Sequence, residues 1–287
     1  MGLVVHHLSC GSMCPIFGRS LDVAELVCHC LLIETERGLV LVDTGMGTED
    51  LAHPMKRLGL SFTLGLRPVR DVAHTAKSQI EAKGFSTTDV RHIVLTHMDL
   101  DHAGGLADFP QAEVHVMRAE HEAATQRRGL HAKMRYQPAQ WAHAPTFHVY
   151  DVAGEPFFDF AAVRELVGLP PELLLVPLGG HSAGHAGVAV DLGDRHLLHC
   201  GDAYFHHGEV DARRPRCPST LRAFQRNVAV DDALRLQNQG RLRSLVAEMP
   251  ARLSVFSAHD PIELSRLVRA AELARAGKSL KNLVATA

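Results

Sequence analysis

Four potential metal ligands lie within six positions directly after an apolar segment, and this feature constrains the fold more than any other. Residues 92–96, His-Ile-Val-Leu-Thr, have the continuous apolar character of a buried strand. They are followed by His97, Asp99, Asp101 and His102, and then by two glycines, which let the backbone approach closely. Imidazole nitrogen and carboxylate oxygen together suit zinc, iron or manganese. Such a chain needs a sheet whose strand ends bring further ligands to the same place.

Three later motifs supply such ligands, each at the end of a predicted strand. They are Gly180-His181-Ser182-Ala183-Gly184-His185, Gly201-Asp202-Ala203-Tyr204 and Ser257-Ala258-His259-Asp260. Each motif alone is weak, because a strand-end histidine is more often a hydrogen-bonded packing residue than a ligand. Their order along the chain, together with a total of 20 histidines, strengthens the metal-site interpretation.

Strands and helices alternate along the chain without a sequence repeat. Strands are expected at 28–35, 38–43, 92–96, 113–117, 173–177, 188–191, 196–200 and 253–258, and helices at 71–83, 118–126, 231–248 and from 261 onward. The first two strands should form a hairpin. The fold class is α/β, and two halves that each mix strands with an outer helical layer predict a single domain with a four-layered αββα sandwich. A three-layer α/β fold also fits the pattern.

Residues 127–170 interrupt this alternation with prolines and aromatic side chains. Seven of the fifteen aromatic residues of the chain fall there. One interpretation is a satellite core beneath a long loop. The other is a lid or pocket wall, because long excursions from a compact fold are often binding elements. Both interpretations stay open, and exposed aromatic residues would serve a homodimer interface as readily.

Composition narrows the class of protein. A formal net charge of −2 gives no reason to expect a nucleic-acid partner. No apolar stretch approaches the roughly 20 residues that span a bilayer, and the N-terminus lacks the pattern of a signal peptide. We therefore expect a soluble, cytoplasmic protein with a small-molecule substrate and no membrane partner. The six cysteines, Cys10, Cys14, Cys28 and Cys30 among them, are interpreted as small buried hydrophobes rather than as a structural zinc site.

The ordered motifs resemble those of the metallo-β-lactamase superfamily. Its ligands follow the order H-x-H-x-D-H, G-H-[ST]-x-G-H, G-D and a late strand-end histidine. The similarity runs from the Val42-Asp43-Thr44-Gly45 loop to His259, which is most of the chain. Within the superfamily, the phrases at 41–45 and 101–105 look most like the hydrolases that open N-acyl homoserine lactones.

The resemblance implies a ligand assignment for two divalent cations, zinc first of all. The first cation would be bound by His97, Asp99 and His181, the second by Asp101, His102 and His259, and the Asp202 carboxylate would bridge the two. His185 matches a position that does not ligate. Asp43 matches an aspartate that supports the ligand loop.

One departure from the family pattern falls at Asp99, where the family has its second histidine. An anionic oxygen ligand favours a harder or mixed metal content, so iron or manganese becomes an alternative to zinc. It also leaves open how tightly this site is filled. The related flavodiiron proteins have a carboxylate at this position, but they carry a flavin-binding module for which this chain has no room.

The ligand set implies a metal-dependent hydrolase that opens a lactone or a carboxylic ester with a metal-bridging hydroxide. Two catalytic roles are expected: Asp101 would pass a proton to the leaving group, and Tyr204 would donate a hydrogen bond to the oxyanion. Tyr204 is equally compatible with a place in the core. The alternatives are an iron-dependent oxidoreductase on the same fold, a thioesterase and a phosphodiesterase, the last of which would need a basic groove that the sequence does not show.

Overall fold

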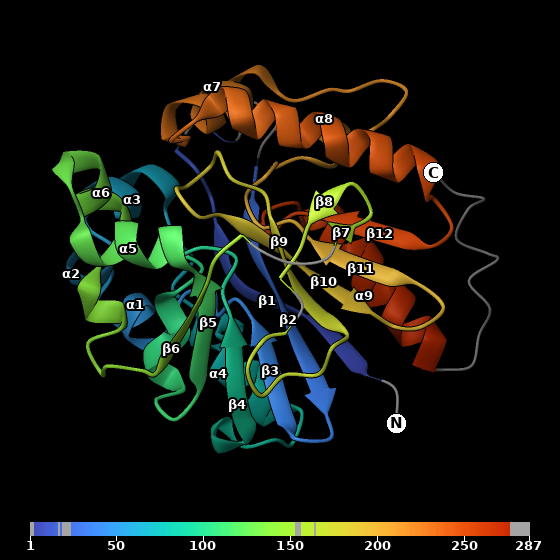
Figure 1. Ribbon diagram of the computed structural model, residues 1–287. Coiled ribbons are helices and arrows are strands. Elements are labelled where there is room, and N and C mark those ends of the chain that lie inside the picture. Colours follow the sequence, from blue (N-terminus) through green and yellow to red (C-terminus); the bar gives the residue numbers. More distant parts are fainter. Residues whose placement is uncertain (1–2, 17, 19–23, 153–155, 164, 276–287) are drawn as a thin grey trace.

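Two β-sheets face each other in the computed structural model, which describes residues 3–16, 18, 24–152, 156–163 and 165–275 (Figure 1). The first sheet has six strands in the order β1-β2-β3-β4-β5-β6. These strands are β1 (Val4–Met13), β2 (Leu26–Thr35), β3 (Gly38–Val42), β4 (Val90–Val94), β5 (Glu113–Met117) and β6 (Phe147–Tyr150). The β1-β2-β3 part is antiparallel, and β3 to β6 pair in parallel.

The second sheet has four strands in the order β12-β11-β10-β9. They are β9 (Leu173–Pro177), β10 (Ala186–Asp191), β11 (His196–His199) and β12 (Leu253–Phe256). Only the β11–β12 pair of this sheet is parallel. A separate short hairpin is formed by β7 (Pro156–Phe157) and β8 (Phe160–Ala161).

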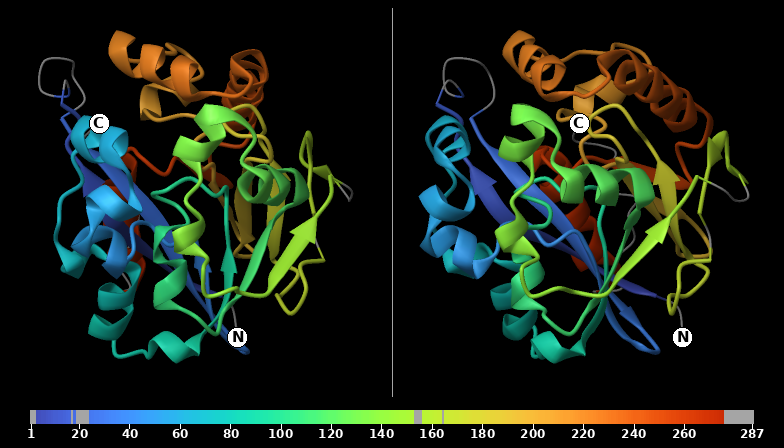
Figure 2. Two further views of the ribbon diagram at one scale, coloured as in Figure 1. Left: turned by 90° about the vertical axis from the view of Figure 1, so that its left-hand side faces the viewer. Right: turned by 60° about the vertical axis from the view of Figure 1, so that its left-hand side comes forward.

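Helices cover the outer faces of both sheets (Figure 2). The α-helices are α1 (Thr48–Ala52), α2 (Pro54–Arg57), α3 (Leu60–Leu66), α4 (Ala76–Ala82), α5 (Arg118–Gln126), α6 (Gly129–Arg135), α7 (Ser219–Val228), α8 (Asp232–Glu248) and α9 (Pro261–Arg275). Short 3₁₀ turns lie at Val72–His74, Thr87–Asp89, Gly104–Asp108, Pro138–Gln140 and His207–Val210. None of the helices within the described ranges is long and apolar enough to cross a membrane.

Two-sided burial of the strands decides between the two predicted architectures. On β2, Leu31 and Ile33 pack between the sheets against residues of β9 and β10, whereas Cys30 and Leu32 pack on the opposite face with α4 and α5. A third apolar cluster joins the second sheet to α8 through Leu242. Because each sheet is covered on both faces, its strands have continuous apolar sequences. The four-layered αββα sandwich is confirmed.

The β2–β3 hairpin is confirmed, but the single helix predicted at 71–83 is wrong. Asp71 caps only the 3₁₀ turn at Val72–His74, and Thr75 then accepts a hydrogen bond from the Ser78 backbone N–H and begins α4. Threonine is a strong N-cap residue, so a second cap inside the predicted span starts a new helix. Gly84 follows the end of α4 with φ of 88°, as expected for a residue that stops a helix.

Residues 127–170 are less irregular than the sequence indicated. They include α6, the edge strand β6 and the β7–β8 hairpin, while 153–155 and 164 lie outside the described residues. The aromatic side chains of this segment pack on the apolar clusters described above, as a satellite core would: Tyr136, Trp141 and Phe147 on one, Tyr150 on another, and Phe157, Phe158 and Phe160 on a third.

The prediction of buried cysteines is confirmed for Cys10, Cys28 and Cys30 and is wrong for Cys14. Cys10, Cys28 and Cys30 are buried, and Cys28 lies in a different apolar cluster from the other two. Cys14 is exposed. No cysteine belongs to any of the potential metal-binding groups found among the described residues.

Candidate metal centre

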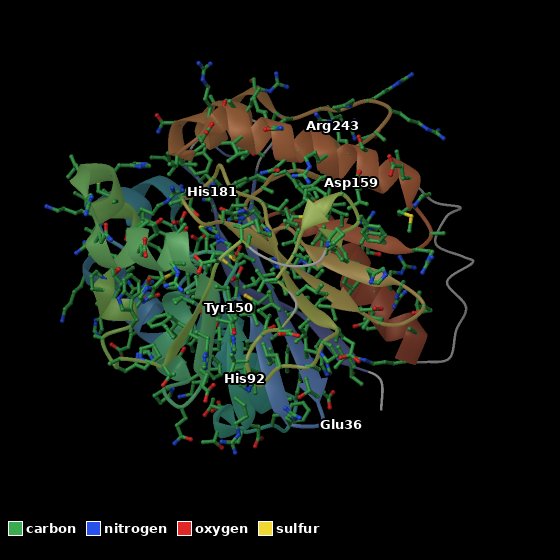
Figure 3. All side chains as sticks on the ribbon, in the orientation of Figure 1. Glu36, His92, Tyr150, Asp159, His181 and Arg243 are labelled. Carbon is green, nitrogen blue, oxygen red and sulfur yellow. The ribbon has the colours of Figure 1, made fainter. Side chains whose placement is uncertain are left out.

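The four motifs meet at one end of the sandwich, where the loops after β4, β9, β11 and β12 lie together. Figure 3 labels His181 at this end and His92 and Glu36 at the other. The loop after β4 carries His97 to His102, and the loops after β11 and β12 carry Asp202 and His259. These residues are separated by up to about 160 positions of sequence, so only the fold brings them together.

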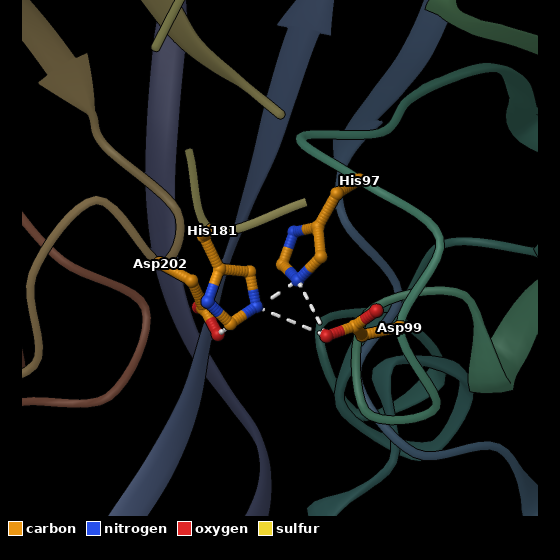
Figure 4. Close-up of side chains that lie close together, drawn as sticks. All are labelled: His97, Asp99, His181 and Asp202. Atoms are coloured by element: carbon orange, nitrogen blue, oxygen red, sulfur yellow. Dashed lines mark hydrogen bonds and ion pairs between the residues drawn. The ribbon is translucent and has the colours of Figure 1, made fainter. Parts of the chain in front are cut away.

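One group of side chains joins His97, Asp99, His181 and Asp202, and we call it the first ligand set (Figure 4). Asp99 Oδ2 lies 3.0 Å from His181 Nε2 and 3.4 Å from His97 Nε2. Asp202 Oδ2 lies 3.3 Å from His181 Nε2 and 3.7 Å from His97 Nε2. Four ligand atoms therefore surround one point.

A second group joins Asp101, His102 and His259, and with the other oxygen of Asp202 it forms the second ligand set. Asp202 Oδ1 lies 3.2 Å from His102 Nε2 and 3.0 Å from His259 Nε2. Asp101 Oδ2 lies 3.6 Å from His259 Nε2. The seven side chains named as ligands from the sequence thus fall into the two predicted groups, with Asp202 between them.

The spacing of these atoms fits metal coordination. Atoms bound at about 2.0–2.2 Å from one tetrahedral zinc ion lie about 3.3–3.6 Å from each other. The distances of 3.0–3.7 Å in the first set and 3.0–3.6 Å in the second set lie on either side of this spacing and within about 0.3 Å of it. The Nε2 atoms of His97 and His102 and Oδ1 of Asp202 are also buried without a hydrogen-bond partner. Buried polar atoms without a partner are rare, and a pair of cations would satisfy these three.

Asp43 supports the second ligand set. Its Oδ2 accepts a hydrogen bond from His102 Nδ1 at 2.8 Å, and its Oδ1 accepts one from the Thr96 backbone N–H at 2.7 Å. A proton held on Nδ1 leaves the Nε2 lone pair of His102 facing the centre. Asp43 has φ of 55°, so the strand end that carries it is held in a left-handed turn.

Two further histidines are oriented by backbone groups. His259 Nδ1 donates to the Val27 carbonyl at 2.7 Å, which again leaves Nε2 for the centre. His185 Nδ1 donates to the Leu178 carbonyl, and its Nε2 accepts a hydrogen bond from the Asp202 backbone N–H at 2.8 Å. Both nitrogens of His185 are used, so this residue holds the Asp202 loop rather than a metal.

Three carboxylates, those of Asp99, Asp101 and Asp202, lie together at the centre. Burial by itself raises the pKa of Asp202, but His259 and His102 outweigh it and hold the pKa well below its usual value. Burial acts in the same way on Asp99, where Arg135 and His97 lower the pKa well below its usual value. Ionised carboxylates in a buried place require cations, and divalent ions are suited to the role.

Arg135 was not predicted from the sequence. Its Nε lies 2.7 Å from Asp99 Oδ1, its Nη2 lies 3.0 Å from His181 Nε2, and its Nη1 donates to the His181 carbonyl. The side chain is 7% exposed. Arg135 is the last residue of α6 and lies within the aromatic-rich segment 127–170. No sequence motif in this segment indicates that Arg135 contacts the ligands.

Glu120 was also missed. This buried residue of α5 accepts hydrogen bonds from the Met98 backbone N–H, the Ser182 hydroxyl and the Gly184 backbone N–H. It thereby fixes the loop of His97 to the loop of His181. A side chain at Gly184 would place a Cβ 2.2 Å from the Glu120 backbone nitrogen, so the G-H-S-A-G-H motif needs its second glycine here.

The structure does not bring Tyr204 to the ligands, which corrects its predicted catalytic role. Its ring is fully buried in the cluster beneath α8, and its hydroxyl donates to Glu263 Oε1 at 3.0 Å. The next residue, Phe205, takes the place at the centre, where its ring stacks on His259 with centroids 4.6 Å apart. Of the two interpretations given for Tyr204, the core residue fits the geometry.

An apolar cavity of about 500 Å³ opens directly above the two ligand sets. Asp99, Asp101, His181, Asp202 and His259 form its floor. Its walls come from α3, α6, α7 and neighbouring loops, with Met13, Leu26, Phe62, Leu66, Met134, Phe205, Leu221, Phe224 and Val228 among the lining residues. The aromatic residues of 127–170 do not line it, although α6 contributes His131, Met134 and Arg135. The apolar wall therefore comes mainly from helices outside the segment where we expected it.

Fold and ligand arrangement together define the class of metallohydrolases with histidine and aspartate ligands at the strand ends of an αββα sandwich. A family profile described as "Metallo-beta-lactamase superfamily" matches residues 23–247. This chain belongs to that superfamily and is a metallohydrolase.

Individual relatives agree with this assignment. A probable metallo-hydrolase of Mycobacterium tuberculosis is 45% identical over 265 residues, which cover 92% of this chain and 82% of the relative. An N-acyl homoserine lactonase of Bacillus cereus is 34% identical over 171 residues, which cover 59% of this chain and 60% of the lactonase. A structure of a Bacillus thuringiensis AiiA variant with bound N-decanoyl-L-homoserine has a TM-score of 0.68 at 21% identity, covering 93% of this chain and 97% of that one. At that identity the structural likeness shows the fold alone.

Proposed function

We propose that this chain is a dinuclear metallohydrolase that opens lactones or carboxylic esters carrying an apolar acyl chain. The observation that carries the proposal is the apolar cavity directly above the two ligand sets. An acyl chain would lie against Leu66, Leu221 and Phe224, and its carbonyl group would reach the floor of the cavity. Burial of such a chain contributes about 0.8 kcal/mol per methylene group to binding. The lactonases among the relatives support this substrate class.

Zinc ions are the cofactors that we propose for both ligand sets, because histidine nitrogen and carboxylate oxygen in tetrahedral spacing suit zinc. When bound, the two ions would supply Lewis acidity and lower the pKa of water for attack on the carbonyl carbon. The chain itself provides an anionic floor and excludes bulk water with apolar walls. Charge interactions within such a site are stronger than in water.

Asp101 is the residue that we propose for proton transfer. It lines the cavity, and its Oδ2 lies 3.6 Å from His259 Nε2 at the edge of the second ligand set. A carboxylate there is within reach of a leaving alkoxide on a bound substrate, and general acid-base groups of this kind contribute about 10²–10⁴-fold to rate. The phenol of Tyr204 has no part in this proposal, since Glu263 holds it.

A substrate panel tests the proposal. The protein, stripped of metal and reloaded with Zn²⁺, is assayed with N-acyl homoserine lactones of increasing chain length, a p-nitrophenyl ester, a thioester and bis-p-nitrophenyl phosphate. We expect kcat/KM to be highest for the lactones or the ester and to rise with acyl chain length. Turnover of the thioester or the phosphodiester alone would contradict the proposal, as would full activity after exhaustive chelation.

The same preparation distinguishes the iron-dependent alternative. We expect protein purified without added metal to contain mainly zinc by elemental analysis, and to show no redox turnover. Iron retained through purification, together with one-electron chemistry and no hydrolysis, would favour an oxidoreductase instead.

A further inference from the structure

A positively charged side chain contacts the first ligand set directly, and among the described residues no Lys or Arg side chain is paired with the second. The Arg135 guanidinium pairs with Asp99 through Nε and also points Nη2 at Nε2 of His181, 3.0 Å away. Both of these residues belong to the first set. In the second set, the partners of His102 and His259 are an aspartate and a backbone carbonyl.

The contact between Arg135 and His181 uses the atom that a metal would need. A guanidinium has donors only, so Nη2–H must point at the lone pair of Nε2. That lone pair also faces Asp99 Oδ2 and Asp202 Oδ2, which means that it is the one directed at the first set. A metal ion and Nη2 cannot share it. A cation that enters the first set must therefore break the hydrogen bond between Arg135 and His181.

The charges around the two sets also favour a cation in the second set over the first. Two carboxylates, Asp99 and Asp202, belong to the first set, but Arg135 already neutralises one of them. The second set keeps Asp101 and Asp202 for an incoming cation. Since the guanidinium is almost fully buried, solvent screens its repulsion of a nearby metal ion only weakly.

The supports of the histidines differ as well. Each histidine of the second set donates its Nδ1 proton to a buried acceptor, which fixes the tautomer that a metal requires. In the first set, His97 Nδ1 lies 2.9 Å from the Thr96 hydroxyl, but His181 Nδ1 is buried without a hydrogen-bond partner. Its ring is instead held from the other side, where Nε2 accepts a hydrogen bond from Arg135 Nη2–H.

From these three differences we infer that Arg135 makes the two metal sites unequal. The second ligand set binds its cation first and tightly, and the first set binds a cation only as Arg135 gives up the His181 lone pair. Arg135 is a positioning residue that sets the affinity of the first site. This property concerns metal binding by the chain and does not depend on which substrate the enzyme hydrolyses.

Stepwise metal titration tests the inference. Metal-free protein is titrated with Co²⁺ and followed by its ligand-field absorption, and with Zn²⁺ in competition with a chromophoric chelator. For the natural chain we expect two steps whose dissociation constants differ by at least about tenfold. In Arg135→Met the dissociation constant of the weaker step should fall by about 10- to 100-fold, which is the range by which residues that contact metal ligands alter metal affinity. The dissociation constant of the tighter step should change by no more than about threefold. Two equal steps in the natural chain, or an unchanged weaker step in Arg135→Met, would overturn the inference.

Two further sets of variants keep the test valid if Arg135→Met folds poorly. Arg118→Met removes an exposed arginine that pairs with Asp151 and belongs to neither ligand set, and it should leave both steps unchanged. With one equivalent of Co²⁺, His181→Ala should bind as tightly as the natural chain, whereas His259→Ala should lose tight binding. The opposite pattern, with tight binding lost in His181→Ala and kept in His259→Ala, would assign the tight site to the first set and refute the inference without any change at Arg135.

Discussion

The two ligand sets share one carboxylate and are built from the same kinds of side chain, yet residues from different elements support them. The second set is fixed by Asp43 and by the Val27 carbonyl, which lie on or beside strands of the first sheet. The first set is fixed by Arg135 and Glu120, which lie on helices. The difference suggests a division of roles: strand-end motifs supply the candidate ligands, and we propose that residues from distant elements set how strongly each site would hold a cation.

The largest expected effect falls on the residue common to both sets. Asp202→Asn keeps the size of the side chain but removes the charge that both cations would share. We expect metal content to fall below one ion per chain after gel filtration and kcat/KM to fall by more than about a hundredfold. Elemental analysis and hydrolysis assays measure both quantities. Full metal content together with full turnover would show that Asp202 does not bridge the two sets.

A smaller effect on metal binding should distinguish the two ligand sets. Asp43→Asn weakens the acceptor of His102 Nδ1 directly, and it reaches His97 of the first set only through the Thr96 hydroxyl, which contacts both Asp43 and His97 Nδ1. We expect the tighter metal step to weaken by about 10- to 100-fold while the weaker step changes little. The stepwise Co²⁺ titration measures this change. Asp151→Asn, which removes a carboxylate from an exposed ion pair, is the matched control. Equal weakening of both steps would mean that the two sets are not independently supported.

The smallest effect on catalysis is expected at Tyr204. Tyr204→Phe removes the hydroxyl that donates to Glu263 and should leave kcat/KM within about twofold, while unfolding free energy falls by about 1–3 kcal/mol. The neighbouring residue, Phe205, already has an aromatic ring without a hydroxyl group. Loss of turnover with unchanged stability would restore the catalytic role that the sequence suggested for this tyrosine.

The loss of stability in Tyr204→Phe should depend on pH. Burial raises the pKa of Glu263 to about 8. A buried acid whose folded pKa exceeds its unfolded value loses stability as pH rises from the unfolded pKa through the folded one. The Tyr204 hydroxyl favours the ionised carboxylate, so its removal should cost more at pH 9 than at pH 6. Urea unfolding at the two pH values measures the difference, and an equal cost at both would contradict the assignment.

The sequence predicted which side chains come together at the centre, because their signal is local. His97 to His102 lie in one short run after an apolar strand, and the later motifs follow strands whose apolar character is plain. Two-sided burial of those strands also made the layered architecture predictable.

Other features depend on contacts that no local pattern encodes. Arg135 reaches Asp99 only because α6 packs over the ligand loop. The sequence suggested Tyr204 rather than Phe205 for the centre because β11 ends at His199, and beyond it strand alternation no longer tells which side chain faces the centre. The strand β1 was missed altogether, since His6 and His7 interrupt its apolar pattern and only pairing with β2 makes it a strand.

The most direct test of the central claim is the anomalous scattering of a crystal of the zinc-loaded protein, measured on both sides of the zinc absorption edge. Two peaks should appear, one among His97, Asp99, His181 and Asp202 and one among Asp101, His102, His259 and Asp202, with higher occupancy at the second. No anomalous peak among these side chains, or peaks only elsewhere in the molecule, would contradict the account.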